Sequence, residues 1–207
     1  MRNLRKLGLV FIATMALTAI YGGASASAAK FTAGKVGASL TEETKVKHVF
    51  TITGGTAECS EVGFEGATEG LEMSSQSVRP TFNGCTAFGF AATLKVTNCK
   101  WVWYPVTDLG FNPEDTVGEC IIEILLSNVF AQCEVLIRSQ KIAGGISSYT
   151  NSGTGHLTIK FNGSANIADE VTKSSGLCPL TVGKHTNSHF SGESTVKATG
   201  SSFGWDA

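Results

Sequence analysis

Six cysteines constrain the fold of this chain more than any other feature of its sequence. They are Cys59, Cys85, Cys99, Cys120, Cys133 and Cys178. No two of them form a Cys-x-x-Cys pair, the commonest signature of a structural zinc site or a thioredoxin-like redox site. An even number of cysteines in an oxidising compartment typically forms disulfides. The sequence therefore predicts three disulfide bonds, provided that the chain leaves the cytoplasm.

The N-terminal sequence indicates that the chain leaves the cytoplasm. Arg2, Arg5 and Lys6 precede an apolar run at residues 7–21, and small residues follow at 24–29. This order is that of a secretory signal peptide, and the run is shorter than the roughly 20 residues that a membrane-spanning helix needs. We expect residues 1–28 to be cleaved and residues 29–207 to form one secreted domain, extracellular or at the cell surface, with a core at about 46–198.

Cysteine order favours one pairing, although six cysteines allow 15 connectivities. Hairpin-rich β proteins permit cysteines that are neighbours in sequence to pair. That rule gives Cys59 with Cys85, Cys99 with Cys120, and Cys133 with Cys178.

Composition and periodicity predict β structure. The chain has 24 glycines and four prolines, and several segments alternate apolar with polar residues, the pattern of half-buried strands. In the first such segment Val46, His48, Phe50 and Ile52 share one face. Further strands are predicted at 88–96, 101–104, 120–126, 131–137, 157–161 and 190–198. This number of short strands favours an all-β fold, an antiparallel β-sandwich or barrel stapled by disulfides.

The stretch between Phe82 and Trp101 holds two of the cysteines. Its apolar residues share one face from 88 to 96, and the parity changes before Trp101. We therefore predict a turn or bulge at Thr97 and Asn98. Cys85 and Cys99 would then flank the predicted strand, each bonded to another strand.

Charge argues against two classes of partner. Three of the 16 basic residues lie in the predicted signal peptide, whereas none of the 17 acidic residues does. The mature chain is thus mildly acidic, without the basic patch that binding of nucleic acid or anionic membranes requires. We expect no nucleic-acid partner, and no membrane span after signal cleavage.

Trp101, Trp103 and Tyr104 form the one aromatic cluster with a candidate binding role. On a strand the two tryptophans would lie on the same side about 6.6 Å apart, a spacing that suits stacking on a sugar. The alternative, which we favour, is that the rings fill the core.

Catalytic and metal motifs are incomplete. Residues 200–204 match the Gly-x-Ser-x-Gly nucleophile elbow with Ser202 at its centre, yet only three residues follow, too few for the acid and the histidine. His185 and His189 have helical metal spacing, but on a strand they would lie about 13 Å apart. We predict no catalytic residue, no metal site and no cofactor.

Several segments resemble a family of uncharacterised secreted proteins that is multiplied in some soil actinobacteria. They are residues 48–59, 82–90, 92–99, 133–140 and 148–151, with Cys178 and Pro179. The resemblance spans about residues 46–198. It implies an all-β domain with paired cysteines and carries no known activity, ligand or catalytic residue.

Three classes of function follow from these patterns. We favour a non-catalytic secreted domain, a structural or interaction protein whose unknown partner is a component of the cell envelope or matrix. The alternatives are a carbohydrate- or small-ligand-binding module using the aromatic cluster, and a secreted hydrolase of unrecognised type.

Overall fold

The computed structural model describes residues 28–207 except 107, 115–117, 129, 144–146 and 164–165. The described residues form strands and no helix, as predicted, and so none of them lies in a helix that could cross a membrane. Residues 1–27 of the predicted signal peptide, which spans residues 1–28, lie outside them. The strands are β1 (Lys30–Ala33), β2 (Ser39–Ile52), β3 (Gly55–Ala67), β4 (Glu72–Met73), β5 (Gln76–Ala87), β6 (Phe90–Ala91), β7 (Thr93–Thr97), β8 (Cys99–Trp103), β9 (Leu109–Pro113), β10 (Ile121–Ser127), β11 (Ala131–Arg138), β12 (Gln140–Ile142), β13 (Ser147–Ser152), β14 (His156–Asn162), β15 (Ile167–Gly176), β16 (Gly183–Ala198) and β17 (Phe203–Asp206).

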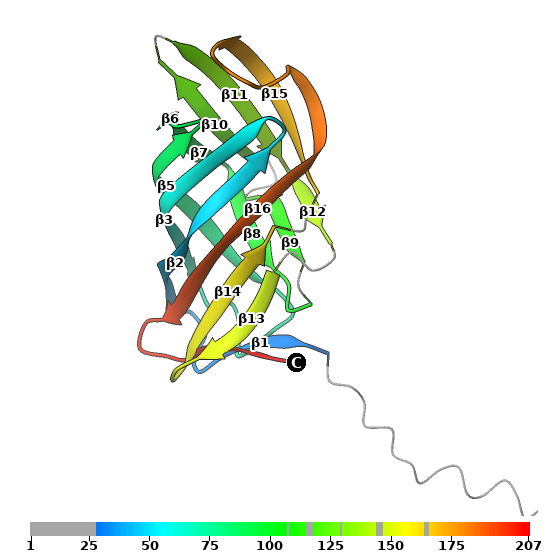
Figure 1. Cartoon of the computed structure of the whole chain (residues 1–207). Coiled ribbons are helices and arrows are strands. Elements are labelled where there is room, and N and C mark those ends of the chain that lie inside the picture. Colours follow the sequence, from blue (N-terminus) through cyan, green and yellow to red (C-terminus); the bar gives the residue numbers. More distant parts are fainter. Residues whose placement is uncertain (1–27, 107, 115–117, 129, 144–146, 164–165) are drawn as a thin grey trace, which may run out of the picture.

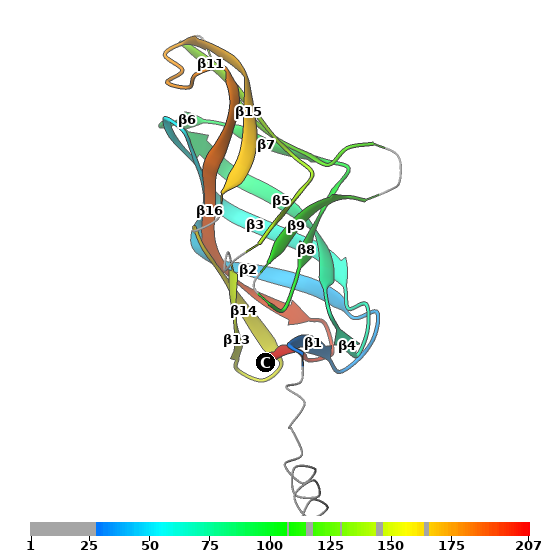
Figure 2. The same cartoon turned by 90° about the vertical axis from the view of Figure 1, so that its right-hand side faces the viewer.

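The strands form a curled antiparallel sheet in the order β12-β9-β8-β5-β3-β2-β16-β15-β11-β10-β7, with the β13–β14 hairpin added on β16. The sheet curls until β7 lies near β5, where the Ala92 amide donates to the Cys85 carbonyl at 3.0 Å. Figure 2 shows β8 and β9 folding over β3 and β5. The result is a half-barrel with sandwich-like layers, in agreement with the predicted class.

Strand β16 runs along most of the molecule (Figure 1). Its first half pairs with β15, its second half pairs with β14, and residues 189–198 pair with β2 on the other side. Register shifts between Ser191 and Ser194 bend it. This one strand therefore joins the two halves of the curled sheet.

A small sheet in the order β17-β1-β4 closes the lower end of the molecule in Figure 1. Strand β1 pairs with β17 from Lys30 opposite Asp206 to Ala33 opposite Phe203. Phe31 and Phe203 are both buried, and their rings stack with centroids 5.9 Å apart. Apolar packing thus fixes the two ends of the described chain to each other.

Aromatic rings from both layers fill the interior around Trp101 of β8. The Trp101 ring lies 5.0 to 5.9 Å from five phenylalanine rings, which come from β3, β5, β9, β14 and β16: Phe64, Phe82, Phe111, Phe161 and Phe190. Ring pairs at such distances stabilise a core beyond the area they bury.

Two details of the predicted strands are wrong. Residues 88–96 are not one strand: Phe88 and Gly89 have φ values of 54° and 82°, so the chain turns there and continues as β6 and then β7. Gly55 permits this turn because a Cβ at that position would lie 2.3 Å from the Phe88 ring. Val46 does not share the buried face of His48 and Phe50 and is 54% exposed.

A side chain explains the exposure of Val46. The Thr44 hydroxyl enters the ladder between β2 and β3, where it accepts from the Val62 amide at 2.9 Å and donates to the Val62 carbonyl at 3.2 Å. Regular pairing of these strands resumes at His48, opposite Cys59. The strand therefore bulges, and Val46 faces solvent. The predicted turn before Cys99 is confirmed by Asn98, whose φ is 47°.

The structure forms three disulfides and leaves none of the six cysteines free. Cys59 and Cys85 face each other on β3 and β5. Cys99, at the start of β8, is bonded to Cys120, just before β10. Cys133 of β11 is bonded to Cys178 in the loop between β15 and β16. These are the pairs that cysteine order favours, and they indicate an oxidising environment.

Candidate functional site

The aromatic cluster does not form a binding platform. Trp101 and Trp103 are fully buried, so neither indole face can stack on a ligand, and the core alternative holds. Tyr104 is half-buried, with the Lys141 ammonium 4.4 Å from its ring centre. The binding role considered for Trp101, Trp103 and Tyr104 is therefore wrong for the two tryptophans because the sheet curls over them.

A serine and a histidine meet inside the half-barrel. His48 Nε2 lies 2.8 Å from Ser194 Oγ, and both residues are fully buried. Burial lowers the pKa of His48 to about 4, so the ring is neutral at pH 7. Burial also raises the pKa of Glu42, whose carboxyl bonds to Ser194 and Thr44. The side chains of His48 and Ser194 are both closed off from solvent, and their hydrogen bond joins β2 to β16 inside the half-barrel.

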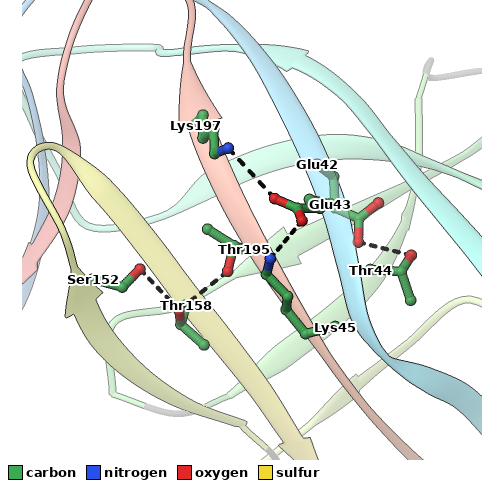
Figure 3. Close-up of polar contacts among 8 residues, drawn as sticks. All are labelled: Glu42, Glu43, Thr44, Lys45, Ser152, Thr158, Thr195 and Lys197. Carbon is green, nitrogen blue, oxygen red and sulfur yellow. Dashed lines mark hydrogen bonds and ion pairs between the residues drawn. The ribbon is translucent and has the colours of Figure 1, made fainter.

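Strands β2, β13, β14 and β16 carry further polar contacts, which form separate groups (Figure 3). Glu43 pairs with Lys45 at 2.5 Å and with Lys197 at 3.4 Å, and the hydrogen bond from Lys45 is the main cause of the lowered Glu43 pKa. Thr158 bonds to Ser152 and Thr195 at 2.9 and 3.3 Å. Both lysines thus pair with the same carboxylate, in ion pairs that are exposed to solvent.

The loops after β10 and β15 meet at the upper end of the molecule in Figure 1, and each carries an exposed apolar side chain. Phe130 is 64% and Leu177 is 68% exposed. The Leu177 amide donates to the Phe130 carbonyl at 2.9 Å, which places the two residues side by side. We call Phe130 and Leu177 the apolar pair.

Covalent and polar contacts hold the apolar pair in place. Asn128 Oδ1 accepts from the amides of Phe130 and Ala131 at 2.8 and 2.9 Å. Cys178, next to Leu177, is bonded to Cys133. Gly176 has a φ of 65° and leaves room for the Phe130 carbonyl, which would lie 2.1 Å from a Cβ there. The pair is thus displayed on a rigid support.

The lower end holds a small pocket instead. Its volume is about 260 Å³, and it is lined by Thr32, Asn151, Gly155, His156, Ser202, Phe203 and Gly204. Ser202, from the Gly-x-Ser-x-Gly match, thus shares a pocket with His156. No carboxylate lines the pocket, and within the described chain no hydrogen bond joins Ser202 to His156. Ser202 also leads into β17 and not into a helix, so the pocket lacks the nucleophile elbow and triad.

The histidines at 185 and 189 do not assemble a metal site. His185 Nε2 lies 2.9 Å from the Thr181 carbonyl oxygen. Among the residues that the structure describes, no three His, Cys, Asp or Glu side chains lie close enough to hold an ion.

Comparison with known proteins gives no match: no family model, no curated protein and no solved structure is significantly similar to this chain.

Proposed function

We propose that this chain is a secreted, non-catalytic interaction domain that binds a protein of the cell envelope or matrix through the apolar pair. The observation that carries the proposal is the rigid display of Phe130 and Leu177 in solvent. The backbone that carries these side chains is already held in place, so its ordering costs little entropy on binding, and neighbouring exposed apolar side chains can mark an interaction site.

Secretion is supported by two independent features. The three disulfides favour an oxidising compartment, and residues 1–28 have the sequence of a signal peptide. The disulfide between Cys133 and Cys178 ties the residue next to Leu177 to β11. The same oxidation that stabilises the fold therefore fixes the proposed binding surface.

A protein partner fits this surface better than an ionic polymer does. Neither loop segment, 127–132 or 174–182, contains a charged residue. Val182, 59% exposed, ends the second segment and extends its apolar character. A surface of this kind suits an apolar groove on another protein, and it provides no counter-charge for an anionic polymer.

The test is retention of the purified, oxidised domain on native cell envelopes and culture matrix, followed by cross-linking and mass spectrometry. We expect one dominant protein to cross-link near residue 130 or 177. The double variant F130S/L177S should lose retention at least about tenfold, the effect of losing one hot spot. The matched control V36S/L71S changes two exposed apolar residues at the lower end and should bind like the natural chain.

Three results would overturn the proposal. One is the absence of retention at micromolar concentration. Another is an equal loss of retention in both double variants. The third is a dimer, measured by sedimentation, that F130S/L177S dissociates, since the occupant of the surface would then be a second copy of this chain.

A further inference from the structure

We propose that the pocket at the lower end binds a small uncharged ligand rich in hydroxyl groups, such as a single sugar ring. The residues that line the pocket come from β1, β13, the turn into β14 and the start of β17. Figure 1 shows these elements together at the lower end. The pocket is at the opposite end from the apolar pair and is independent of the function proposed above.

The pocket offers several hydrogen-bonding groups in a small space. Thr32 and Ser202 each supply a hydroxyl, which both donates and accepts, and His156 supplies an imidazole. Asn151 is held by β17, since its Oδ1 accepts from the Trp205 amide at 2.8 Å and its Nδ2 donates to the Trp205 carbonyl at 2.7 Å. The amide retains one donor and one acceptor position for a ligand.

Charge selects against ionic ligands. No Asp, Glu, Lys or Arg side chain lines the pocket. Two lysines lie near the pocket in the sheet: Lys30 is on β1, and Lys197 is opposite His156. Each forms an ion pair with a carboxylate. Lys30 pairs with Glu72 at 2.7 Å, and Lys197 pairs with Glu43 at 3.4 Å. These two lysines are thus each engaged by a carboxylate, whereas the hydroxyl, amide and imidazole groups of the pocket supply hydrogen-bond donors and acceptors.

Two glycines keep the pocket open. A Cβ at Gly204 would lie 3.0 Å from Asn151 Oδ1 and 3.4 Å from Thr32 Oγ1. Gly155 has a φ of 76°, and a Cβ there would lie 2.8 Å from the Ser202 Cβ. The volume of about 260 Å³ is below the range of roughly 300 to 1,000 Å³ for drug-sized ligands, and it suits one ring and not a chain of rings.

The walls of the pocket are fixed before any ligand binds. The Phe203 amide donates to the Gly155 carbonyl at 3.0 Å, and the Gly34 amide donates to the Ser202 carbonyl at 3.1 Å. The Phe203 side chain is fully buried beneath the pocket. A preformed site lowers the entropic cost of binding and permits measurable affinity for a ligand that makes few contacts.

The test is a titration of the oxidised domain with methyl glucopyranoside, N-acetylglucosamine and inorganic phosphate, followed by amide NMR. We expect at least one sugar to shift the amides of Gly155 and residues 202–205, with Kd on the order of 1 to 10 mM for so small a contact. Phosphate should leave these amides unchanged.

Matched glycine variants locate the binding. G204A places a methyl group against Asn151 and Thr32 and should weaken binding at least about tenfold, the loss expected when pocket hydrogen bonds are blocked. G110A is the control, because a Cβ at Gly110 meets only ordinary contacts at 3.4 to 3.5 Å, on β9. G110A should bind like the natural chain, and S202A should bind more weakly without loss of fold.

The proposal fails if no sugar at about 50 mM, well above the expected Kd, shifts these amides. It also fails if G204A binds as tightly as G110A, or if phosphate shifts the same residues more strongly than the sugars do. Because G204A leaves the upper end unchanged, its retention on envelopes should equal that of the natural chain, and the two proposals succeed or fail separately.

Discussion

The two ends of the half-barrel are built by different means. The upper end displays apolar side chains on loops that a disulfide ties to the sheet. The lower end buries Phe31 and Phe203 of the β1–β17 pair and leaves a small pocket that no disulfide of the described chain reaches. The loops that carry the apolar pair are held to the sheet by a covalent bond, whereas the β1–β17 pair at the lower end is held by the packing of its own buried rings.

Reduction should produce the largest effect and act first on the upper end. Each disulfide contributes about 3 to 4 kcal/mol by the chain-entropy estimate, so loss of all three should lower the melting temperature strongly or unfold the chain. C133A/C178A should lose about 4 kcal/mol and expose the loop around residue 177 to protease. Calorimetry and limited proteolysis measure both. A reduced chain with an unchanged melting temperature, or a free thiol in the oxidised chain, would contradict the role of the disulfides.

The next prediction compares the replacement of one phenylalanine by alanine at each end of the molecule. F203A removes a fully buried ring and should cost about 3 to 5 kcal/mol. F130A removes a largely exposed ring and should change stability by about 0.5 kcal/mol or less. Urea denaturation gives both values. Similar losses in the two variants would show that the ends are not built differently.

Acid should act on the core that the two ends share. In the folded chain His48 has a pKa of about 4, against 6.5 when unfolded. The unfolded state therefore binds more protons between these values, and the free energy of unfolding falls as pH drops from 6.5 to about 4, by about 3 kcal/mol in all. Above pH 6.5 this contribution is fully present.

Two variants isolate the histidine in denaturant unfolding at several pH values. H48Q retains a partner for Ser194 and should remove the pH dependence. Burial raises the pKa of Glu42, which has the opposite effect because the folded state then holds the carboxyl proton more tightly. The dependence on His48 is therefore measured in an E42Q background. Amide hydrogen exchange gives a further check. If the amides of the upper and lower ends lost their protection from exchange at different pH values, the two ends would not share one core.

The smallest effect is expected on the outer face between the ends. E43Q removes both ion pairs of Glu43, which is exposed like its partners. Exposed pairs contribute little, so stability should change by less than about 0.5 kcal/mol, and the change should vanish in high salt. Denaturation with and without salt checks this, and a loss above about 1 kcal/mol would assign the network in Figure 3 a structural role.

Local patterns in the sequence predict the fold class and the cysteine pairs. Alternation in segments such as 131–137 reflects contact with one core, and each cysteine is bonded to its neighbour in sequence. The pattern does not predict β3, because its buried residues change parity between Cys59 and Val62. Its partner β5 changes parity between Phe82 and Cys85, where Gly84 has a φ of 59°.

The candidate sites depend on contacts that no local pattern contains. Phe130 and Leu177 lie in separate loops, and either one alone is an ordinary surface residue. The pocket combines residues from β1, the β13–β14 turn and the chain entering β17. His48 and Ser194 are 146 residues apart. These contacts depend on the order of the strands in the sheet, which the alternation of apolar and polar residues does not determine.

The position of β16 has a consequence for how the chain folds. Of the described strands in the curled sheet this one comes last in the sequence, yet it lies between β2 on one side and β14 and β15 on the other. The curled sheet cannot form until residues 183–198 have emerged, and pairings over such long separations are slow. We therefore expect strands close in sequence, such as β2 with β3 and β10 with β11, to pair first and the two halves of the sheet to join only when β16 has emerged.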